Sequence, residues 1–223
     1  MRAGVNDPKN GMTMWQAFAY YATLLIESVV GVFGIRLYEE PRHAVIDRIG
    51  DRIEIRSYGP RLAATAEVAK AGAAGRSEAF QLLFTYIAGA NTAAGTSSAR
   101  IAMTTPVQVS PMRVAMTTPV QAAEKAGAVQ MQFFLPMEYT LESAPKPSDP
   151  RVRIVSVPEE TIAALRFSGS GSDVADRQSE LLATLAASKW MITGAPYTLN
   201  YDAPFTIPFL RRNEAAVTVR AKD

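Results

Sequence analysis

Alternating apolar and polar positions follow residue 42 of this chain and predict a series of short β-strands. Strands are expected at 43–49 and 52–58, joined by a hairpin turn at 50–51. A third strand is expected at 62–69, followed by a glycine-rich turn at 72–75. The chain after residue 42 is therefore expected to start as antiparallel β-structure.

The pattern changes to a helical period at 77–88. Apolar side chains recur there at spacings of three and four residues, which predicts a helix with one apolar stripe facing a core. The stripe consists of Phe80, Leu83, Phe84 and Ile87. Gly89 stands where this helix is expected to end.

One stretch occurs twice, as RIAMTTPVQ at 100–108 and as RVAMTTPVQ at 113–121. In each copy larger apolar side chains alternate with smaller or polar ones, which predicts a strand with one buried face. Pro106 and Pro119 lack a backbone N–H donor, so these strands are expected at a sheet edge or at a bulge.

The second half of the chain repeats the order of the first half in different letters. A second helix is expected to begin near Ser172 or Asp173 and to run toward Gly194. The strands expected around it are 129–135, 151–157, 161–167, 197–201 and 215–220. This order predicts one internally duplicated α+β domain with a curved antiparallel sheet and two helices, because neither half has enough apolar surface to close alone.

The amino-terminal residues 15–35 are almost uninterrupted apolar sequence, so 1–35 is expected to form a segment separate from the domain at 36–223. The length suits an apolar helix crossing a bilayer, which needs roughly 20 residues. Glu27 opposes this, because an acid is costly in hydrocarbon. A membrane anchor, a signal peptide and a helix that packs on the domain or on a partner all stay open. The expected location is membrane-associated on an undecided side, with exported or periplasmic and cytoplasmic as alternatives.

Composition excludes several classes of function. The chain has 223 residues and no cysteine, so it has no disulfide, zinc–thiolate site, thiol nucleophile or thiolate heme ligand. The net charge of +2 is not concentrated in a basic stripe, and no nucleic-acid partner is expected. No phosphate loop, His-x-x-x-His pair or serine triad with a supporting context occurs.

The repeated Ala-Met-Thr-Thr-Pro-Val motif resembles the central motif of the SOUL/heme-binding protein family, and 53–60 (IEIRSYGP) resembles its opening block. Further similar blocks lie at 134–136, 139–142, 145–147, 149–152, 165–169, 201–205 and 210–214. The resemblance implies a distorted antiparallel β-barrel flanked by two helices, with heme or a related tetrapyrrole in a shallow apolar groove near the first helix. It implies binding for carriage, buffering or delivery, and not catalysis.

The residues that the resemblance and the apolar stripe nominate for tetrapyrrole binding are Arg56, Ser57, Tyr58, Phe80, Leu83, Phe84, Ile87, Met103 and Met116. Rim cations for the propionates are expected among Arg56, Arg100 and Arg113. Each also has a simpler interpretation: the apolar stripe and both methionines suit a core, and an arginine suits a solvated surface.

Ser57 stands where some family members carry a histidine proposed to bind the heme iron. Serine is a poor iron ligand, so that coordination does not carry over. His43, the only histidine of the chain, is the candidate metal ligand, and a surface histidine is its alternative interpretation. A metal-free tetrapyrrole or another amphipathic molecule, and an enzyme acting on such a ligand, remain the alternative functions.

Overall fold

The computed structural model describes residues 39–93, 98–112, 127–170, 173–202 and 206–222. The apolar segment 15–35 therefore lies outside the described residues. The elements are β1 (His43–Ile49), β2 (Ile53–Tyr58), β3 (Arg61–Val68), α2 (Gly72–Ile87), β4 (Asn91–Thr92), β5 (Val107–Met112), β6 (Ala128–Phe134), β7 (Lys146–Pro147), β8 (Val152–Val157), β9 (Glu160–Phe167), α3 (Val174–Ala186), β10 (Trp190–Ile192), β11 (Tyr197–Asn200), η1 (Pro208–Leu210) and β12 (Asn213–Ala221).

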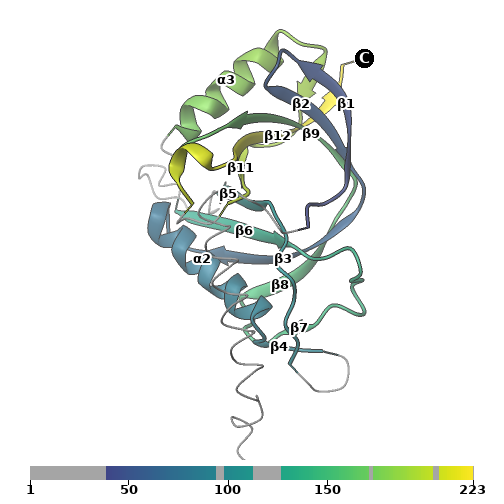
Figure 1. The fold of residues 1–223 in the computed structure, drawn as a ribbon, viewed down its shortest axis with the longest axis vertical. Coiled ribbons are helices and arrows are strands. Elements are labelled where there is room, and N and C mark those ends of the chain that lie inside the picture. The colour runs from purple at the N-terminus through teal and green to yellow at the C-terminus, as the bar shows by residue number, and fades with distance from the viewer. Residues whose placement is uncertain (1–38, 94–97, 113–126, 171–172, 203–205, 223) are drawn as a thin grey trace, which may run out of the picture.

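Nearly all strands join one antiparallel sheet in the order β1-β2-β9-β12-β11-β5-β6-β3-β8, with β10 added beside β12. The sheet curls, and both helices lie on its outer side (Figure 1). This confirms the α+β class with two flanking helices. The expected barrel is a half-barrel, because no hydrogen bonds join the outer strands β1 and β8 in the described part of the chain.

The topology repeats across the two halves of the chain. β3, α2, β5 and β6 correspond in order and neighbours to β9, α3, β11 and β12, and β5 pairs with β11 where the halves meet. β3 and β9 even bury the same positions along their lengths. The preceding strands are exchanged: β2 leads into β3 but pairs with β9, while β8 leads into β9 but pairs with β3. Each half therefore completes the sheet of the other.

The structure corrects the start of the first helix. α2 begins at Gly72, so the expected turn at 72–75 is the first turn of the helix. Gly72 has a φ of +66°, a conformation that glycine adopts without strain. A Cβ at Gly75 would lie 2.0 Å from the backbone oxygen of Lys70, so only glycine lets the helix start this close to the end of β3. Sequence periodicity missed this turn because close backbone packing requires small residues that carry no apolar signal.

The first copy of the repeat is a strand only in its last part. β5 begins at Val107, and the residues before it form a loop that holds a parallel bridge between Thr104 and Glu39. The Thr105 N–H also donates to the Glu39 carbonyl oxygen at 3.0 Å. The loop thus uses its backbone groups to fix the start of the domain instead of extending the sheet. The second copy, with Arg113 and Met116, lies outside the described residues.

Three apolar clusters fill the fold. The first lies between α2 and the sheet of the first half, and the second between α3 and the sheet of the second half. The third lies on the opposite face of the second half, where Tyr58, Tyr197 and Tyr201 gather. The amphipathic helices therefore cover the outer face, while tyrosines occupy the inner one.

Candidate functional site

The larger of two cavities between described residues, here called the large pocket, lies where the chain enters the domain and has a volume of about 700 Å³. Its walls come from residues 39–42, the β2–β3 turn, the start of β3 and the loop that follows β6. Its apolar lining residues are Pro41, Pro60, Leu62, Phe134, Leu135, Pro136, Met137, Tyr139 and Leu141. This is a mainly apolar cavity assembled from segments that are far apart in sequence.

Two arginines bring positive charge to the large pocket. Arg61 lies between two aromatic rings, 4.2 Å from the ring centre of Tyr58 and 4.6 Å from that of Phe134, and it pairs with Glu160. The Nε of Arg61 is buried and has no hydrogen-bond partner in the described structure. Arg42 is exposed, and no ion pair to it occurs within the described ranges. Arg42 is thus available to an anionic ligand, and Arg61 is held rigidly in the wall.

Two of the predicted residues lie behind this wall. The ring of His43 is 4.9 Å from the ring of Tyr58, and Tyr58 in turn contacts Arg61. His43 Nδ1 is 3.3 Å from the Pro41 carbonyl oxygen. Burial raises the pKa of Tyr58, although the charge of Arg56 opposes this shift. Ser57 is half-buried and, because side chains alternate along β2, points to the opposite face of the sheet from Tyr58.

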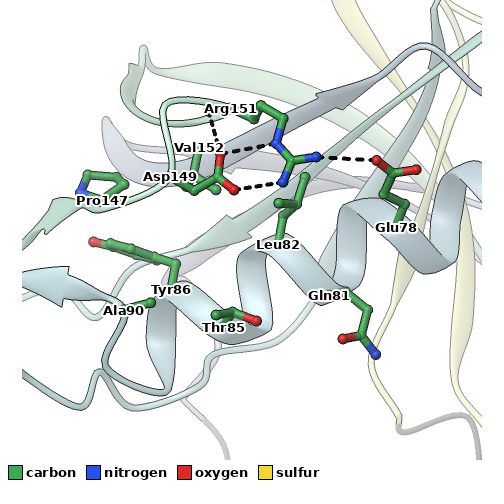
Figure 2. A pocket seen from close by; sticks show the side chains of 10 residues that line it. All are labelled: Glu78, Gln81, Leu82, Thr85, Tyr86, Ala90, Pro147, Asp149, Arg151 and Val152. Atoms are coloured by element: carbon green, nitrogen blue, oxygen red, sulfur yellow. Dashed lines mark hydrogen bonds and ion pairs between the residues drawn. The ribbon is translucent and has the colours of Figure 1, made fainter.

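A smaller cavity of about 320 Å³, here called the α2 groove, runs along α2 beside β7 and β8. Its apolar contacts include Leu82, Tyr86 and Val152, as Figure 2 shows. Arg151 is held there by Asp149 at 2.7 Å and by Glu78 at 3.4 Å. Hydrogen bonds from Arg151 lower the pKa of Asp149 to about 2, so this carboxylate is ionised at neutral pH. It therefore neutralises Arg151, the one cation that lines the α2 groove.

The apolar stripe of the first helix lies largely in the core. Leu83 and Ile87 are buried, and Phe80 stacks on Phe84 at 5.8 Å between ring centres. Phe84 is 49% exposed. None of these four residues lines the large pocket or the α2 groove. Met103 is partly buried against the same core. The structure therefore separates the predicted residues of α2 from those of β2.

Arg56 lies inside the protein and not at a rim. Its side chain is 3% exposed and donates to both carboxylate oxygens of Glu214, at 2.6 and 3.0 Å. Tyr201 and Arg212 donate to the same carboxylate. Burial would raise the pKa of Glu214, but the hydrogen bonds and charge of Arg56 and the charge of Arg212 outweigh it, and the pKa is lowered.

Of the other two candidate rim cations, Arg113 lies outside the described residues and Arg100, which is exposed, adds to neither cavity. Arg42 and Arg61, which do line the large pocket, were missed by the sequence analysis. The Gly59-Pro60 turn before Arg61 marked a break in the chain, but nothing in the sequence showed that residues 39–42 and 134–142 meet it.

The lining of the large pocket suits the porphyrin ring better than it suits coordination of the heme iron. Its apolar walls and arginines suit a flat apolar ring with carboxylates, whereas no imidazole lines it. Among the described residues no three His, Cys, Asp or Glu side chains form a metal-binding group. Met137 and Tyr139 belong to residue types that ligate heme iron, and they are the side chains of the lining that would hold it. Bound heme iron would supply redox and ligand-exchange chemistry.

The described residues form an α+β fold with two matching halves, a curled sheet and a mainly apolar pocket. Residues 38–218 match the family described as SOUL heme-binding protein, so the chain belongs to this family. The sequence matches none of the curated proteins compared with it.

Two solved structures share the fold at low sequence identity. The C-terminal domain of EcmrR aligns with a TM-score of 0.56 and 9% identity, covering 78% of this chain and 99% of that domain. An uncharacterized conserved protein from Listeria innocua aligns with a TM-score of 0.52 and 14% identity, covering 76% of this chain and 92% of the other. These likenesses concern the architecture alone.

Proposed function

We propose that this protein binds heme or a related tetrapyrrole in the large pocket and serves its carriage, buffering or delivery without catalysing a reaction. Membership of a heme-binding family supports the ligand class. The apolar large pocket with its arginines supports the location of the binding site, and it is the observation that carries the proposal.

Size and chemistry favour the large pocket over the α2 groove. Small-molecule sites measure about 300–1,000 Å³, so 700 Å³ lies well inside the range and 320 Å³ at its lower limit. A tetrapyrrole is flat and apolar with carboxylates at one edge. The large pocket offers apolar walls with Arg42 free at its mouth, whereas the cation of the α2 groove is held by two carboxylates.

Titration of the full chain with hemin tests this proposal. We expect a saturable shift of the Soret band and quenching of tryptophan or tyrosine fluorescence at micromolar hemin. Arg42→Glu should weaken binding by roughly 10- to 100-fold, because a hydrogen bond to a charged group contributes about 1.5–3 kcal/mol. Arg151→Glu in the α2 groove is the matched control and should bind like the unmodified chain. The reverse pattern would move the site to the α2 groove, and absence of any saturable response would refute tetrapyrrole binding.

A metal-free tetrapyrrole is the second candidate ligand, because the large pocket lacks an imidazole and Ser57 replaces the histidine of some family members. Affinities for hemin, protoporphyrin and biliverdin should be compared on the same protein. Equal affinities for hemin and protoporphyrin would indicate that the iron has no protein ligand. An unchanged heme spectrum in His43→Ala would dismiss His43 as a ligand.

A further inference from the structure

Two of the most exposed large apolar side chains of the fold flank the large pocket. Met137 is 58% exposed and Leu141 is 60% exposed, and both lie on the loop that follows β6. Exposed apolar groups beside a cavity mouth mark a surface that contacts something apolar, because exposure to water is unfavourable for them. We call these two side chains the apolar rim.

Another part of the wall of the large pocket is the attachment point of the amino-terminal segment. Glu39 lines this pocket and is fixed by its bridge to Thr104 and by the hydrogen bond from the Thr105 N–H. Ile35, the last residue of the apolar segment, lies four residues before Glu39. An extended chain covers at most about 3.6 Å per residue, so the segment must end within about 14 Å of the pocket wall.

The apolar segment favours a bilayer only slightly when taken alone. Between residues 15 and 35 it contains nine Leu, Ile, Val and Phe residues, which favour insertion into a bilayer. Their combined free energy of insertion is only slightly larger than the cost of one central acid such as Glu27. Additional apolar contacts next to the end of the segment would therefore strengthen the attachment to a bilayer. The apolar rim is placed to supply them.

The charges near the apolar rim select the kind of surface. Glu138 and Glu142 are exposed next to Met137 and Leu141, so the apolar rim itself carries negative charge. The other charges of the lining are balanced, because Glu39 stands against Arg42 and Glu160 pairs with Arg61. An anionic surface would be repelled over the Debye length of about 10 Å. A neutral lipid surface would not be repelled.

We propose that the apolar rim docks on a neutral lipid surface beside the point where the segment at 15–35 enters it, so that the large pocket opens toward the bilayer. An amphipathic ligand then passes between bilayer and pocket without crossing water. This last consequence rests on the proposed function, whereas the docking itself does not.

The absence of cysteine gives a clean test on the full chain. Glu142→Cys, beside the apolar rim, and Ala183→Cys, on the exposed side of α3, each carry one environment-sensitive fluorophore. With phosphatidylcholine vesicles we expect a blue shift and protection from iodide at position 142 and no change at position 183. Adding phosphatidylglycerol should weaken the response at position 142.

Substitutions separate the apolar rim from the segment. Met137→Asp with Leu141→Asp should weaken the response at position 142 by roughly tenfold, because two half-exposed apolar side chains no longer enter the lipid. Phe209→Asp removes a side chain that is 73% exposed but does not line the large pocket, and it should leave the response unchanged. Urea unfolding of each variant checks that the fold persists.

Several outcomes would overturn the docking. One is a protein that co-floats with vesicles in a density gradient but gives no fluorescence response at position 142. The others are a protein that does not co-float with vesicles and a fluorescence response that occurs without vesicles. A vesicle-free response would assign the rim to the chain's own segment, or to a second copy if it rises with protein concentration. Hemin titration without vesicles tests the proposed function separately, so a failure of heme binding is distinguishable from a failure of docking.

Discussion

Glu214 is the centre of a buried network of hydrogen bonds and ion pairs on the inner face of the fold. Its carboxylate is completely buried on β12 and is held by Arg56 from β2, by Arg212 and by the Tyr201 hydroxyl. A buried carboxylate is tolerated only when its oxygens are paired, since removing it from water is otherwise costly. This network therefore fastens β2, a strand from the start of the chain, to β12 at its end.

Glu214→Ala should destabilise the protein by about 3–5 kcal/mol, because it leaves the Arg56 guanidinium buried without its partner. Urea denaturation of the variant and of the unmodified chain measures this difference. Glu78→Ala, which breaks only partly exposed ion pairs with Lys70 and Arg151, is the control and should change stability by less than about 1 kcal/mol. Equal effects of the two substitutions would show that the buried network contributes no more than a surface pair.

The same network predicts a dependence of stability on pH. Glu214 has a lowered pKa in the folded protein, whereas its ordinary value is 4.5. The unfolded state therefore takes up protons first, and the stabilising contribution is present above about pH 5 and lost as pH falls through the folded pKa. Urea midpoints measured from pH 7 to pH 3 should fall less steeply in Glu214→Gln than in the unmodified chain. Parallel curves would contradict the assignment.

At the scale of elements, α2 shows how a helix can begin where its sequence looks like a turn. The first turn of α2 contains small residues and glycine, and no side chain caps it. Its stabilisation comes instead from packing, since Ala79, Leu83 and Tyr86 are buried against the sheet. The Tyr86 hydroxyl donates to the Pro145 carbonyl oxygen at 2.8 Å, and burial raises the pKa of Tyr86 to about 12. The end of α2 is thereby tied to the strands that follow.

Gly75→Ala should destabilise the protein by about 1–3 kcal/mol, since the added methyl group would displace the backbone at Lys70. Gly59→Ala is a matched control, because nothing lies within 4 Å of a Cβ at Gly59. That substitution should be neutral or stabilising by less than about 1 kcal/mol. Thermal unfolding followed by circular dichroism compares the two. A neutral Gly75→Ala would mean that α2 can shift away from β3.

At the scale of the whole molecule, the exchange of β2 and β8 makes the two halves interdependent. β2 pairs with β9 along its whole length, and β8 pairs with β3. Each half by itself would leave a central strand without one neighbour and would expose unpaired backbone groups. The duplication is thus a feature of the chain order and not a division into two domains.

Separate fragments 1–144 and 145–223 should each lack a stable fold, because the partner strand of β3 or of β9 is missing from it. Mixing the fragments should restore the sheet. Amide NMR spectra of the single and mixed fragments measure this, with the intact chain as reference. A well-dispersed spectrum from fragment 145–223 alone would contradict interdependence.

Local pattern predicted most elements of this protein. The strands near 43–49, 52–58 and 161–167 and the helix that contains Phe80 and Leu83 follow from apolar periodicity, because period depends only on neighbouring residues. The family blocks indicated the family, which the match over residues 38–218 shows. The sequence by itself therefore determined most of the elements, their order and the membership of a heme-binding family.

Only the tertiary structure decided which strands pair and where a cavity opens. Arg56 and Glu214 are 158 residues apart, and the large pocket unites the chain entry at 39–42 with the turn before Arg61 and the loop after β6. Such contacts depend on sheet register and on the exchange of β2 and β8, which bring distant segments together through long-range hydrogen bonding and packing. No local pattern contains that information, because each segment satisfies its own periodicity whichever partner it meets.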